Sequence, residues 1–136
     1  MYPPELVAPM KSELTEVGFE ELVTPDAVDK AITASGTTFV LINSVCGCAA
    51  ANARPAARIA ITNDKRPDRI TTVFAGVDAE AVNQARKYML PYPPSSPSMA
   101  LFKDGKLVHF IERHHIEGRP AEMIAENLAA AFNEYC

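Results

Sequence analysis

The chain has 136 residues, of which 48% are hydrophobic and 22% are charged, and its formal net charge at pH 7 is -4. These proportions are typical of one globular domain and exclude a disordered tail or a fibrous repeat. Nucleic acid and anionic membranes attract basic patches, so the mild acidity argues against both as partners. We also expect no targeting leader within residues 1–19 and no membrane-spanning segment, because the apolar runs are too short.

Cysteine usage indicates chemistry rather than structural cross-linking. A domain of this length can bury enough apolar surface to fold without disulfide bonds or a structural metal ion. We expect a cytoplasmic protein, and cytoplasmic thiols are kept reduced. The three cysteines, Cys46, Cys48 and Cys136, are therefore expected to be reactive or metal-ligating groups.

Two helices are predicted before the first strong strand. Apolar residues recur at helical spacing from 6 to 17, and Gly18 provides a natural stop. Thr24 and Pro25 are of the types preferred at the N-cap and the first position of a second helix. A weak strand at 19–23 is compatible with the sequence between the two helices.

The next segment combines a buried strand with a helix that contains a proline. Residues 38–43, Thr-Phe-Val-Leu-Ile-Asn, are apolar or β-branched nearly throughout, which predicts a central strand covered on both faces. Cys46-Gly47-Cys48 follows, and an alanine-rich helix then extends to Ala60. Pro55 lies inside this helix and should kink it, because proline removes one helical hydrogen bond.

The second half of the chain completes an α/β pattern. In order, we expect a strand over 69–75, a helix over 78–89, a loop with four prolines over 90–98, strands over 99–103 and 106–111, and a final helix that begins at Pro120. Asp104-Gly105 suits the tight turn between the last two strands. A strand–helix–strand unit implies parallel pairing and the hairpin adds antiparallel pairing. The predicted fold therefore has three layers, α/β/α, with helices on both faces of a central mixed β-sheet.

Cys46 and Cys48 lie where the central strand gives way to a helix. Unpaired backbone N–H groups and the positive end of the helix dipole lower the pKa of a thiol at such a junction, and a thiolate is the nucleophile of disulfide exchange. A disulfide across one residue needs a distorted turn, which Gly47 permits, and strain makes such a bond easier to reduce. We assign Cys46 as the attacking thiolate and Cys48 as the resolving thiol. The alternative is a pair of small core residues.

A proline-rich loop supplies a second signal. Ser96-Pro97 precedes the strand that begins at Met99, and X-Pro is the bond type for which the cis form is accessible. Cysteines at a strand–helix junction, a proline in the following helix and a proline before a strand–Asp-Gly–strand hairpin together resemble the thioredoxin superfamily. The resemblance implies that Pro97 is cis and faces the cysteines, whereas the proline alone would indicate an ordinary turn.

A closer resemblance, to the bacilliredoxin family, covers essentially the whole chain. It rests on Asn-Ser-Val-Cys-Gly-Cys-Ala-Ala at 43–50, Ala-Arg-Pro-Ala-Ala at 53–57, Val-Phe-Ala-Gly at 73–76, Pro-Ser-Ser-Pro-Ser-Met-Ala-Leu at 94–101 and Ile-Glu-Gly at 116–118. The resemblance implies one thioredoxin-like domain over residues 1–136 with an N-terminal helical extension. It also implies a cytoplasmic thiol–disulfide oxidoreductase that removes bacillithiol, a low-molecular-weight thiol, from mixed disulfides on client proteins. The first cysteine would attack, with no cofactor beyond the thiol co-substrate.

The chain departs from ordinary thioredoxin in two respects. It has no tryptophan before the cysteines, and only one residue separates the cysteines. Both differences favour exchange with adducts of small thiols over general dithiol reduction.

Four further residues are expected to bind substrate: Ser96, Pro97, Arg113 and His114. The hairpin should return residues 112–115 to the edge of the sheet that carries the cysteines. There Arg113 can bind a carboxylate of a small thiol, and His114 can tune the thiolate or transfer protons. A solvated loop with local hydrogen bonds is the alternative for this segment.

Several residues are expected to support the site without reacting. Asn43 and Ser44 are assigned as helix caps or as loop-ordering groups, with capping favoured. Arg54 and Arg58 lie on the helix that follows the cysteines and can add positive potential. Cys136, the last residue, is a secondary candidate for a third redox thiol that pairs with a partner or with another subunit.

Two other functions remain open on the sequence. The cysteines and the adjacent histidines can ligate zinc, copper or an iron–sulfur cluster, although Cys-x-Cys is an unusual spacing for a closed zinc site, and we assign no metal. The cysteine pair can also act as a non-catalytic redox sensor that only records thiol adducts. Metal analysis and turnover of a thiolated protein discriminate among the three functions.

Overall fold

The run of β-branched and apolar residues before the cysteines forms the central strand of a five-stranded sheet in the computed structural model, which describes residues 2–136. This strand, β2 (Thr37–Asn43), is buried along its whole length. It pairs in parallel with β3 (Arg69–Phe74) on one side and antiparallel with β4 (Ser98–Lys103) on the other. The predicted central position of the strand is confirmed.

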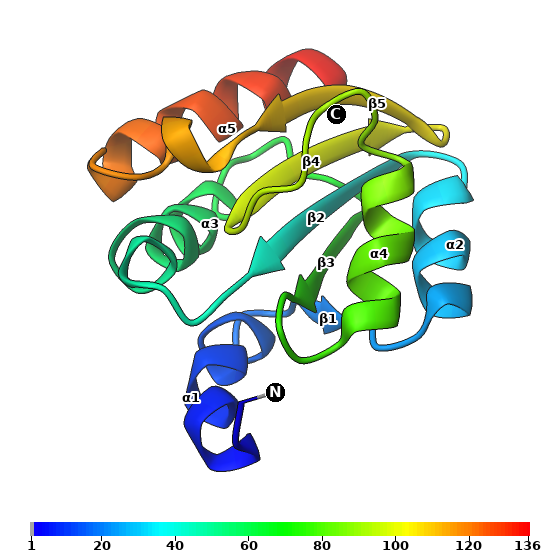
Figure 1. Cartoon of the computed structure of the whole chain (residues 1–136). Helices are drawn as coiled ribbons and strands as arrows, with labels where there is room; N and C mark the ends of the chain where they lie inside the picture. The colour runs from blue at the N-terminus through cyan, green and yellow to red at the C-terminus, as the bar shows by residue number, and fades with distance from the viewer. Residues whose placement is uncertain (1) are drawn as a thin grey trace.

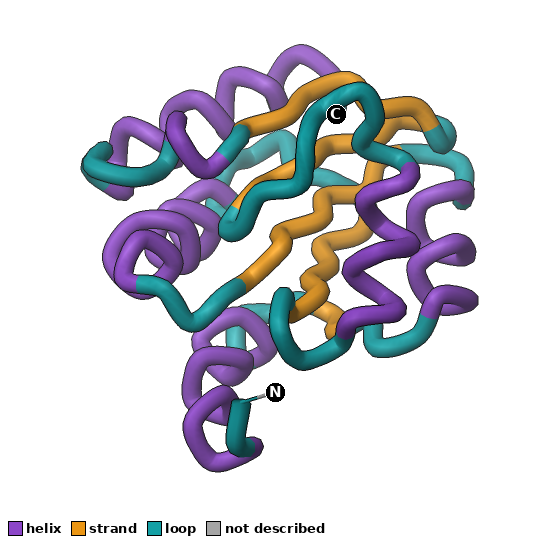
Figure 2. The backbone as a smooth tube through the Cα atoms, viewed as in Figure 1, coloured by secondary structure: helices purple, strands orange, loops and turns teal. Residues whose placement is uncertain are grey.

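Two outer strands complete the sheet in the order β1-β3-β2-β4-β5. β1 (Glu20–Glu21) pairs in parallel with β3, so the weak strand expected at 19–23 is present. β5 (Lys106–Ile111) pairs antiparallel with β4. The Asp104-Gly105 turn between them has positive φ at both residues, 51° and 82°, as a tight hairpin turn requires. The sheet is therefore mixed, as predicted (Figure 2).

Helices cover both faces of this sheet and give the predicted three layers (Figure 1). α2 (Pro25–Thr33) and α4 (Ala79–Lys87) lie on one face, whereas α3 (Arg54–Ala60) and α5 (Ala121–Tyr135) lie on the other. α1 (Pro4–Thr15) precedes them and contacts α3. None of the described helices is long and apolar enough to cross a membrane.

Local side-chain chemistry explains two of the helix boundaries. Thr24 caps α2 as predicted, because its Oγ1 accepts a hydrogen bond from the Ala27 N–H over 3.1 Å. α1 ends at Thr15, two residues earlier than the apolar spacing predicts. Val17 instead packs against the core from a turn that ends at Gly18, whose φ of 104° is rarely adopted by a residue with a Cβ.

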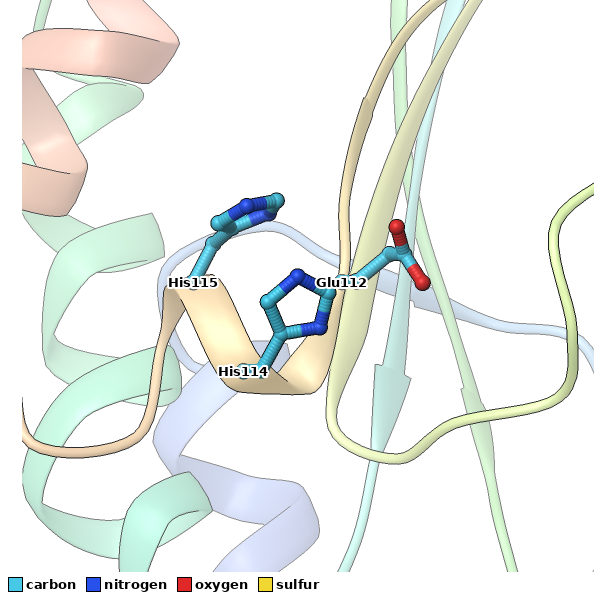
Figure 3. Close-up of side chains that lie close together, drawn as sticks. All are labelled: Glu112, His114 and His115. Carbon is cyan, nitrogen blue, oxygen red and sulfur yellow. The ribbon is translucent and has the colours of Figure 1, made fainter.

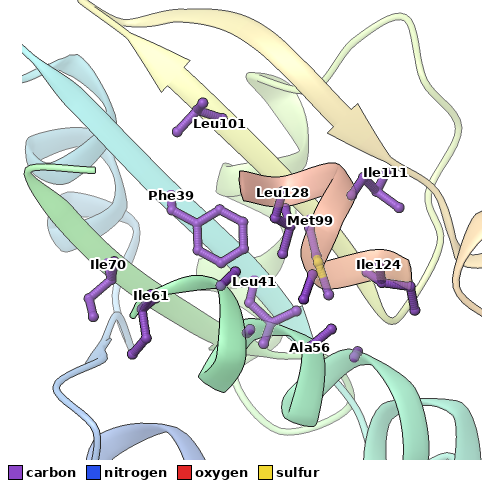
Figure 4. Close-up of a cluster of buried hydrophobic side chains, with 14 of the residues drawn as sticks. Phe39, Leu41, Ala56, Ile61, Ile70, Met99, Leu101, Ile111, Ile124 and Leu128 are labelled. Atoms are coloured by element: carbon purple, nitrogen blue, oxygen red, sulfur yellow. The ribbon is translucent and has the colours of Figure 1, made fainter. Parts of the chain in front are cut away.

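The larger hydrophobic core lies between the sheet and the layer formed by α3 and α5 (Figure 4). The Phe39 ring makes edge-on contacts with Phe19 and Phe132, at 6.1 and 5.7 Å between ring centroids. The α3 side of this core consists of small residues, and Ala56 and Ala57 are fully buried. Small side chains let α3 approach the sheet closely. Because the helical segment begins at the cysteine pair, this packing also fixes the position of the loop that carries them.

Pro55 disturbs the helix after the cysteines through a π-helical segment. In η1 (Ala49–Ala53) the hydrogen bonding is π-helical, and the Arg54 N–H donates to the Ala49 carbonyl oxygen five residues back. Pro55 is the second residue of α3 and has no N–H, and in a regular helix its ring would clash with the carbonyl four residues back. The disturbance expected at Pro55 therefore takes the form of a wider helical turn.

Candidate active site

Cys46 lies on a short loop between the C-terminal end of β2 and a helical turn. Its carbonyl oxygen accepts hydrogen bonds from the N–H groups of Ala49 at 3.0 Å and Ala50 at 3.2 Å, so the turn begins at this residue. Cys46 is partly exposed, whereas Cys48 is buried, with 9% of its surface exposed. The first cysteine thus lies at a helix start, and it is the more accessible of the two.

Four hydrogen-bond donors converge on the Cys46 sulfur. Burial alone would raise the pKa of this thiol, but hydrogen bonds from the Cys48 thiol, the Ser44 hydroxyl and the N–H groups of Ala49 and Cys48 outweigh burial and lower the pKa. The Ser44 Oγ lies 3.3 Å from the Cys46 Sγ. Each donor stabilises the anion more than the neutral thiol, so Cys46 ionises before an ordinary cysteine does.

Cys48 has the opposite protonation preference. Burial raises the pKa of this thiol, and its hydrogen bond to Cys46 and the nearby charge of Cys46 raise the pKa further, while Arg113 opposes the shift. The proton between the two sulfurs therefore resides on Cys48 when Cys46 is ionised. The pair thus places one accessible thiolate beside one protected thiol, as an attacking and a resolving cysteine require.

Asn43 and Ser44 order the loop before Cys46 rather than cap the helix, which corrects the favoured prediction. The Asn43 Oδ1 accepts the Ser44 N–H at 2.9 Å, and the Ser44 Oγ accepts the Cys46 N–H at 3.4 Å. Both oxygens therefore bind N–H groups that precede the helical turn. Local turns of this kind compete with helix capping because they use the same side-chain oxygen.

A buried arginine supports this loop from behind. Arg54 is only 1% exposed, and its Nη1 donates to the Asn43 Oδ1 and to the Ser44 carbonyl oxygen, both at 2.9 Å. Its Nε lies 3.2 Å from the Glu13 Oε1, as an ion pair without a well-aligned hydrogen bond. A buried guanidinium is costly unless it is paired and hydrogen-bonded. These contacts therefore hold Arg54, and through it the Ser44 backbone, in one position.

Arg54 and Arg58 have different environments in the structure, although the sequence predicts the same role for both. Arg58 faces α1, where it donates to the Glu13 carbonyl oxygen at 2.8 Å and pairs with the Glu16 carboxylate at 2.9 Å. The role of Arg54 as a buried loop support was missed from the sequence. One signal was available, because Arg54 shares a helical face with Ala57, a buried residue three positions on.

The cysteine loop forms one wall of a cleft of about 220 Å³. Among the described residues, the lining consists of Tyr2, Ser44, Val45, Cys46, Ala75, Gly76, Ser96 and Arg113. The Ser96–Pro97 peptide bond is cis, which confirms the prediction for this proline. Ser98 pairs with Ile42 of β2, so the register places Pro97 beside the end of the strand that carries the cysteines.

Arg113 and His114 were both assigned to substrate binding from the sequence. In the structure only Arg113 lines the cleft beside Cys46. Arg113 lines the cleft, donates to the Ser96 carbonyl oxygen at 3.3 Å and pairs with Glu117 at 3.1 Å. Its side chain is 44% exposed, so its charge is accessible to an anionic group in the cleft. His114 is outside the lining of the cleft, and its ring lies 4.0 Å from that of His115 between centroids.

Comparison with known proteins identifies the family. A family model described as "Disulphide isomerase" matches residues 2–136. The chain is 60% identical to a bacilliredoxin of Cytophaga hutchinsonii over 134 residues, which cover 98% of this chain and 99% of the relative. It is 55% identical to a bacilliredoxin of Halalkalibacterium halodurans over 136 residues, which cover 99% of this chain and 94% of the relative. The chain belongs to the bacilliredoxin family.

Solved structures confirm the thioredoxin-like fold of this bacilliredoxin-family chain. Mitochondrial thioredoxin 3 of Saccharomyces cerevisiae, in its oxidised form, matches with a TM-score of 0.62 at 16% identity, covering 90% of this chain and 99% of that one. Fasciola hepatica thioredoxin matches with a TM-score of 0.61 at 19% identity, covering 87% and 100%. Family membership and the setting of Cys46 and Cys48 together make the chain a thiol–disulfide oxidoreductase.

In this member of the bacilliredoxin family, Cys136 lies far from the active pair. Its sulfur accepts a hydrogen bond from the side chain of Thr37, the first residue of β2, whereas Cys46 lies three residues beyond Asn43, the last residue of the same strand. The two ends of such a strand are about 20 Å apart at about 3.3 Å per residue. Partial desolvation and the nearby Asp68 carboxylate raise the pKa of this exposed thiol, which leaves less of it ionised at neutral pH.

Gly47, the residue between the cysteines, lies in open space. A Cβ at this position would meet no atom within 4 Å, and its φ is outside the left-handed region that favours glycine. The reduced pair therefore does not require glycine here. The prediction that Gly47 permits a distorted turn applies to the Cys46–Cys48 disulfide, whereas both cysteines are free thiols in this structure.

Proposed function

We propose that this oxidoreductase removes bacillithiol, or a related low-molecular-weight thiol, from mixed disulfides on cytoplasmic client proteins. One observation carries the proposal: the accessible Cys46 sulfur accepts hydrogen bonds that stabilise its thiolate, whereas the adjacent Cys48 retains its proton. Such a pair can capture a thiol adduct and then release it. The names of the relatives support the same activity, since both are called bacilliredoxins.

In the first step, the Cys46 thiolate attacks the small-thiol sulfur of the mixed disulfide. A bond forms between Cys46 Sγ and that sulfur, the bond to the client cysteine breaks, and the client leaves as a thiolate that takes a proton from water. The adduct then lies in the cleft of about 220 Å³ beside Cys46. Arg113 on the cleft wall can bind a carboxylate of the adduct.

In the second step, the Cys48 sulfur attacks Cys46 Sγ after losing its proton to solvent. A Cys46–Cys48 disulfide forms, the bond to the adduct breaks, and the small thiol leaves as a thiolate. Apart from burial, two causes of the raised pKa of Cys48 are contacts with Cys46, so capture of an adduct removes them and promotes ionisation of Cys48. Two electrons from low-molecular-weight thiols or from a dithiol reductant then restore the reduced pair.

Turnover of a bacillithiolated protein tests this function directly. A client that carries one bacillithiol adduct is incubated with a small amount of the reduced chain and an excess of free thiol as reductant. We expect the wild-type chain to restore many equivalents of client and Cys46→Ser to restore no more than the free thiol does alone. Without the free thiol, Cys48→Ser should accumulate an adduct on Cys46. One equivalent of adduct on the wild-type chain without turnover would contradict the proposal and indicate the passive sensor instead.

A further inference from the structure

A second group of reactive side chains lies at the exit of β5, outside the cysteine pair. Glu112, His114 and His115 flank Arg113 at the short 3-10 helix η2 (Arg113–His115). One donor atom from each lies within 4.8 Å of the other two, and no other group of three potential metal ligands occurs in the described part of the chain. Figure 3 shows both imidazole rings and the carboxylate projecting from this one turn.

The three side chains are accessible to a ligand. His114 and His115 are exposed and Glu112 is half-buried, and the two imidazole rings lie 4.0 Å apart between centroids, tilted by 50°. The remaining histidine of the chain differs, because His109 Nε2 is engaged with the Asn127 Oδ1 at 2.7 Å. An exposed neutral imidazole keeps one ring nitrogen for a metal ion.

The chemistry of this donor set indicates the class of ion. Two imidazoles and one carboxylate suit Zn²⁺, Cu²⁺ or Ni²⁺, whereas Mg²⁺ and Ca²⁺ favour sites built from oxygen ligands. Three protein ligands also leave one position of a tetrahedral Zn²⁺ site open to water or to an external group. We propose that Glu112, His114 and His115 bind one divalent transition-metal ion. The cysteines, which the sequence suggested as ligands, take no part in this site.

The proposed metal site is adjacent in sequence to a residue of the cleft. Arg113 lies between Glu112 and His114 in the chain, and its side chain lines the cleft together with Cys46. An ion held by three side chains of one short turn would restrict the backbone that carries Arg113, and it would add positive charge at the rim. The ion would therefore act on the surroundings of the cysteine pair without ligating either sulfur.

Equilibrium dialysis against Zn²⁺ tests this proposal without relying on activity. The full chain with Cys46, Cys48 and Cys136 replaced by serine is used, because thiolates themselves bind Zn²⁺. We expect one Zn²⁺ per chain and no retained Mg²⁺. His114→Asn, His115→Asn and Glu112→Gln should each weaken Zn²⁺ binding by about tenfold or more, because loss of a group that only orients a ligand already costs about tenfold to a hundredfold. His109→Asn is the matched control and should bind Zn²⁺ as the parent does.

Magnetic resonance of the histidine rings provides a second readout. Addition of Zn²⁺ should shift the imidazole signals of His114 and His115 and leave those of His109 in place. The proposal is overturned if the parent retains no Zn²⁺, if His114→Asn and His109→Asn bind it equally well, or if Mg²⁺ is retained equally. The three ligand side chains are exposed or half-buried, so circular dichroism should show that each ligand variant is as folded as the serine-substituted parent.

Discussion

Arg54 holds the Ser44 backbone in place: its Nη1 donates to the Ser44 carbonyl oxygen over 2.9 Å. The hydroxyl of the same serine lies 3.3 Å from the Cys46 sulfur. A charge that is almost completely buried therefore positions one of the donors that stabilise the thiolate. The arginine does not touch the reacting atoms, so it acts as a positioning residue.

Replacing Arg54 should change both stability and the nucleophile. In Arg54→Met, the Asn43 and Ser44 oxygens lose their shared donor, which should lower the free energy of unfolding by about 1–3 kcal/mol. The pKa of Cys46 should rise, because Ser44 is no longer held against the sulfur. Urea denaturation measures the first effect, and the pH dependence of thiolate absorbance measures the second.

Two further variants test whether Arg54 acts by positioning Ser44 rather than through its charge alone. Arg54→Lys keeps the charge but lacks the planar fork, so it should restore the stability and the pKa of Cys46 only in part. Arg58→Met is the control on the same helix. It should lower the free energy of unfolding by less than about 1 kcal/mol, because the Arg58–Glu16 ion pair is exposed. An unchanged pKa of Cys46 in Arg54→Met would contradict the positioning role.

Arg113 should affect recognition more than chemistry. In Arg113→Ala, we expect KM for a bacillithiolated substrate to rise by about threefold to tenfold, because a partly exposed charge-assisted contact to a carboxylate is lost, while kcat stays close to that of the wild type. Steady-state kinetics measure KM and kcat separately. Arg119→Ala is the control, since Arg119 carries the same charge but lines a different cavity. An unchanged KM in Arg113→Ala would remove the recognition role.

Cys136 should be dispensable for exchange within one chain. It lies near Thr37, at the opposite end of β2 from the active pair. We therefore expect Cys136→Ser to turn over a bacillithiolated client at the wild-type rate. A large loss of rate would show that Cys136 of a second chain takes part in the reaction.

Close packing of α3 gives a prediction about stability. Ala56 is fully buried against the sheet, so Ala56→Leu should lower the free energy of unfolding by about 1–3 kcal/mol through overpacking. Ala51→Leu places the same side chain on the exposed face of the preceding turn and should change stability by less than about 0.5 kcal/mol. Equal effects of the two substitutions in thermal unfolding would mean that the helix does not depend on small residues at this contact.

Much of the fold can be predicted because local signals determine it. The β-branched run at 38–43 is typical of a central strand, Asp104-Gly105 of a hairpin turn, and Thr24 of an N-cap, and all three are present. The cis form of Pro97 followed from the resemblance to a family rather than from the residues alone.

The site was harder to predict, because its contacts join distant segments. Solvation favours an exposed arginine, and only the convergence of Asn43, Ser44 and Glu13 compensates for the burial of Arg54. The position of His114 outside the cleft was also not predicted from the sequence. In a 3-10 turn, successive side chains point about 120° apart, so Arg113 can face the cleft while its neighbour does not.

Residue-specific alkylation across a range of pH tests the central claim that Cys46 is the thiolate of this site. The reduced chain is treated briefly with less than one equivalent of iodoacetamide, and the label is located by peptide mass spectrometry. Because the pKa of Cys46 is lowered and that of Cys48 is raised, label should appear on Cys46, with its half-maximal rate at a lower pH than for a free cysteine peptide. Label on Cys48 first, or titration of Cys46 at or above the pH of the free peptide, would contradict the account.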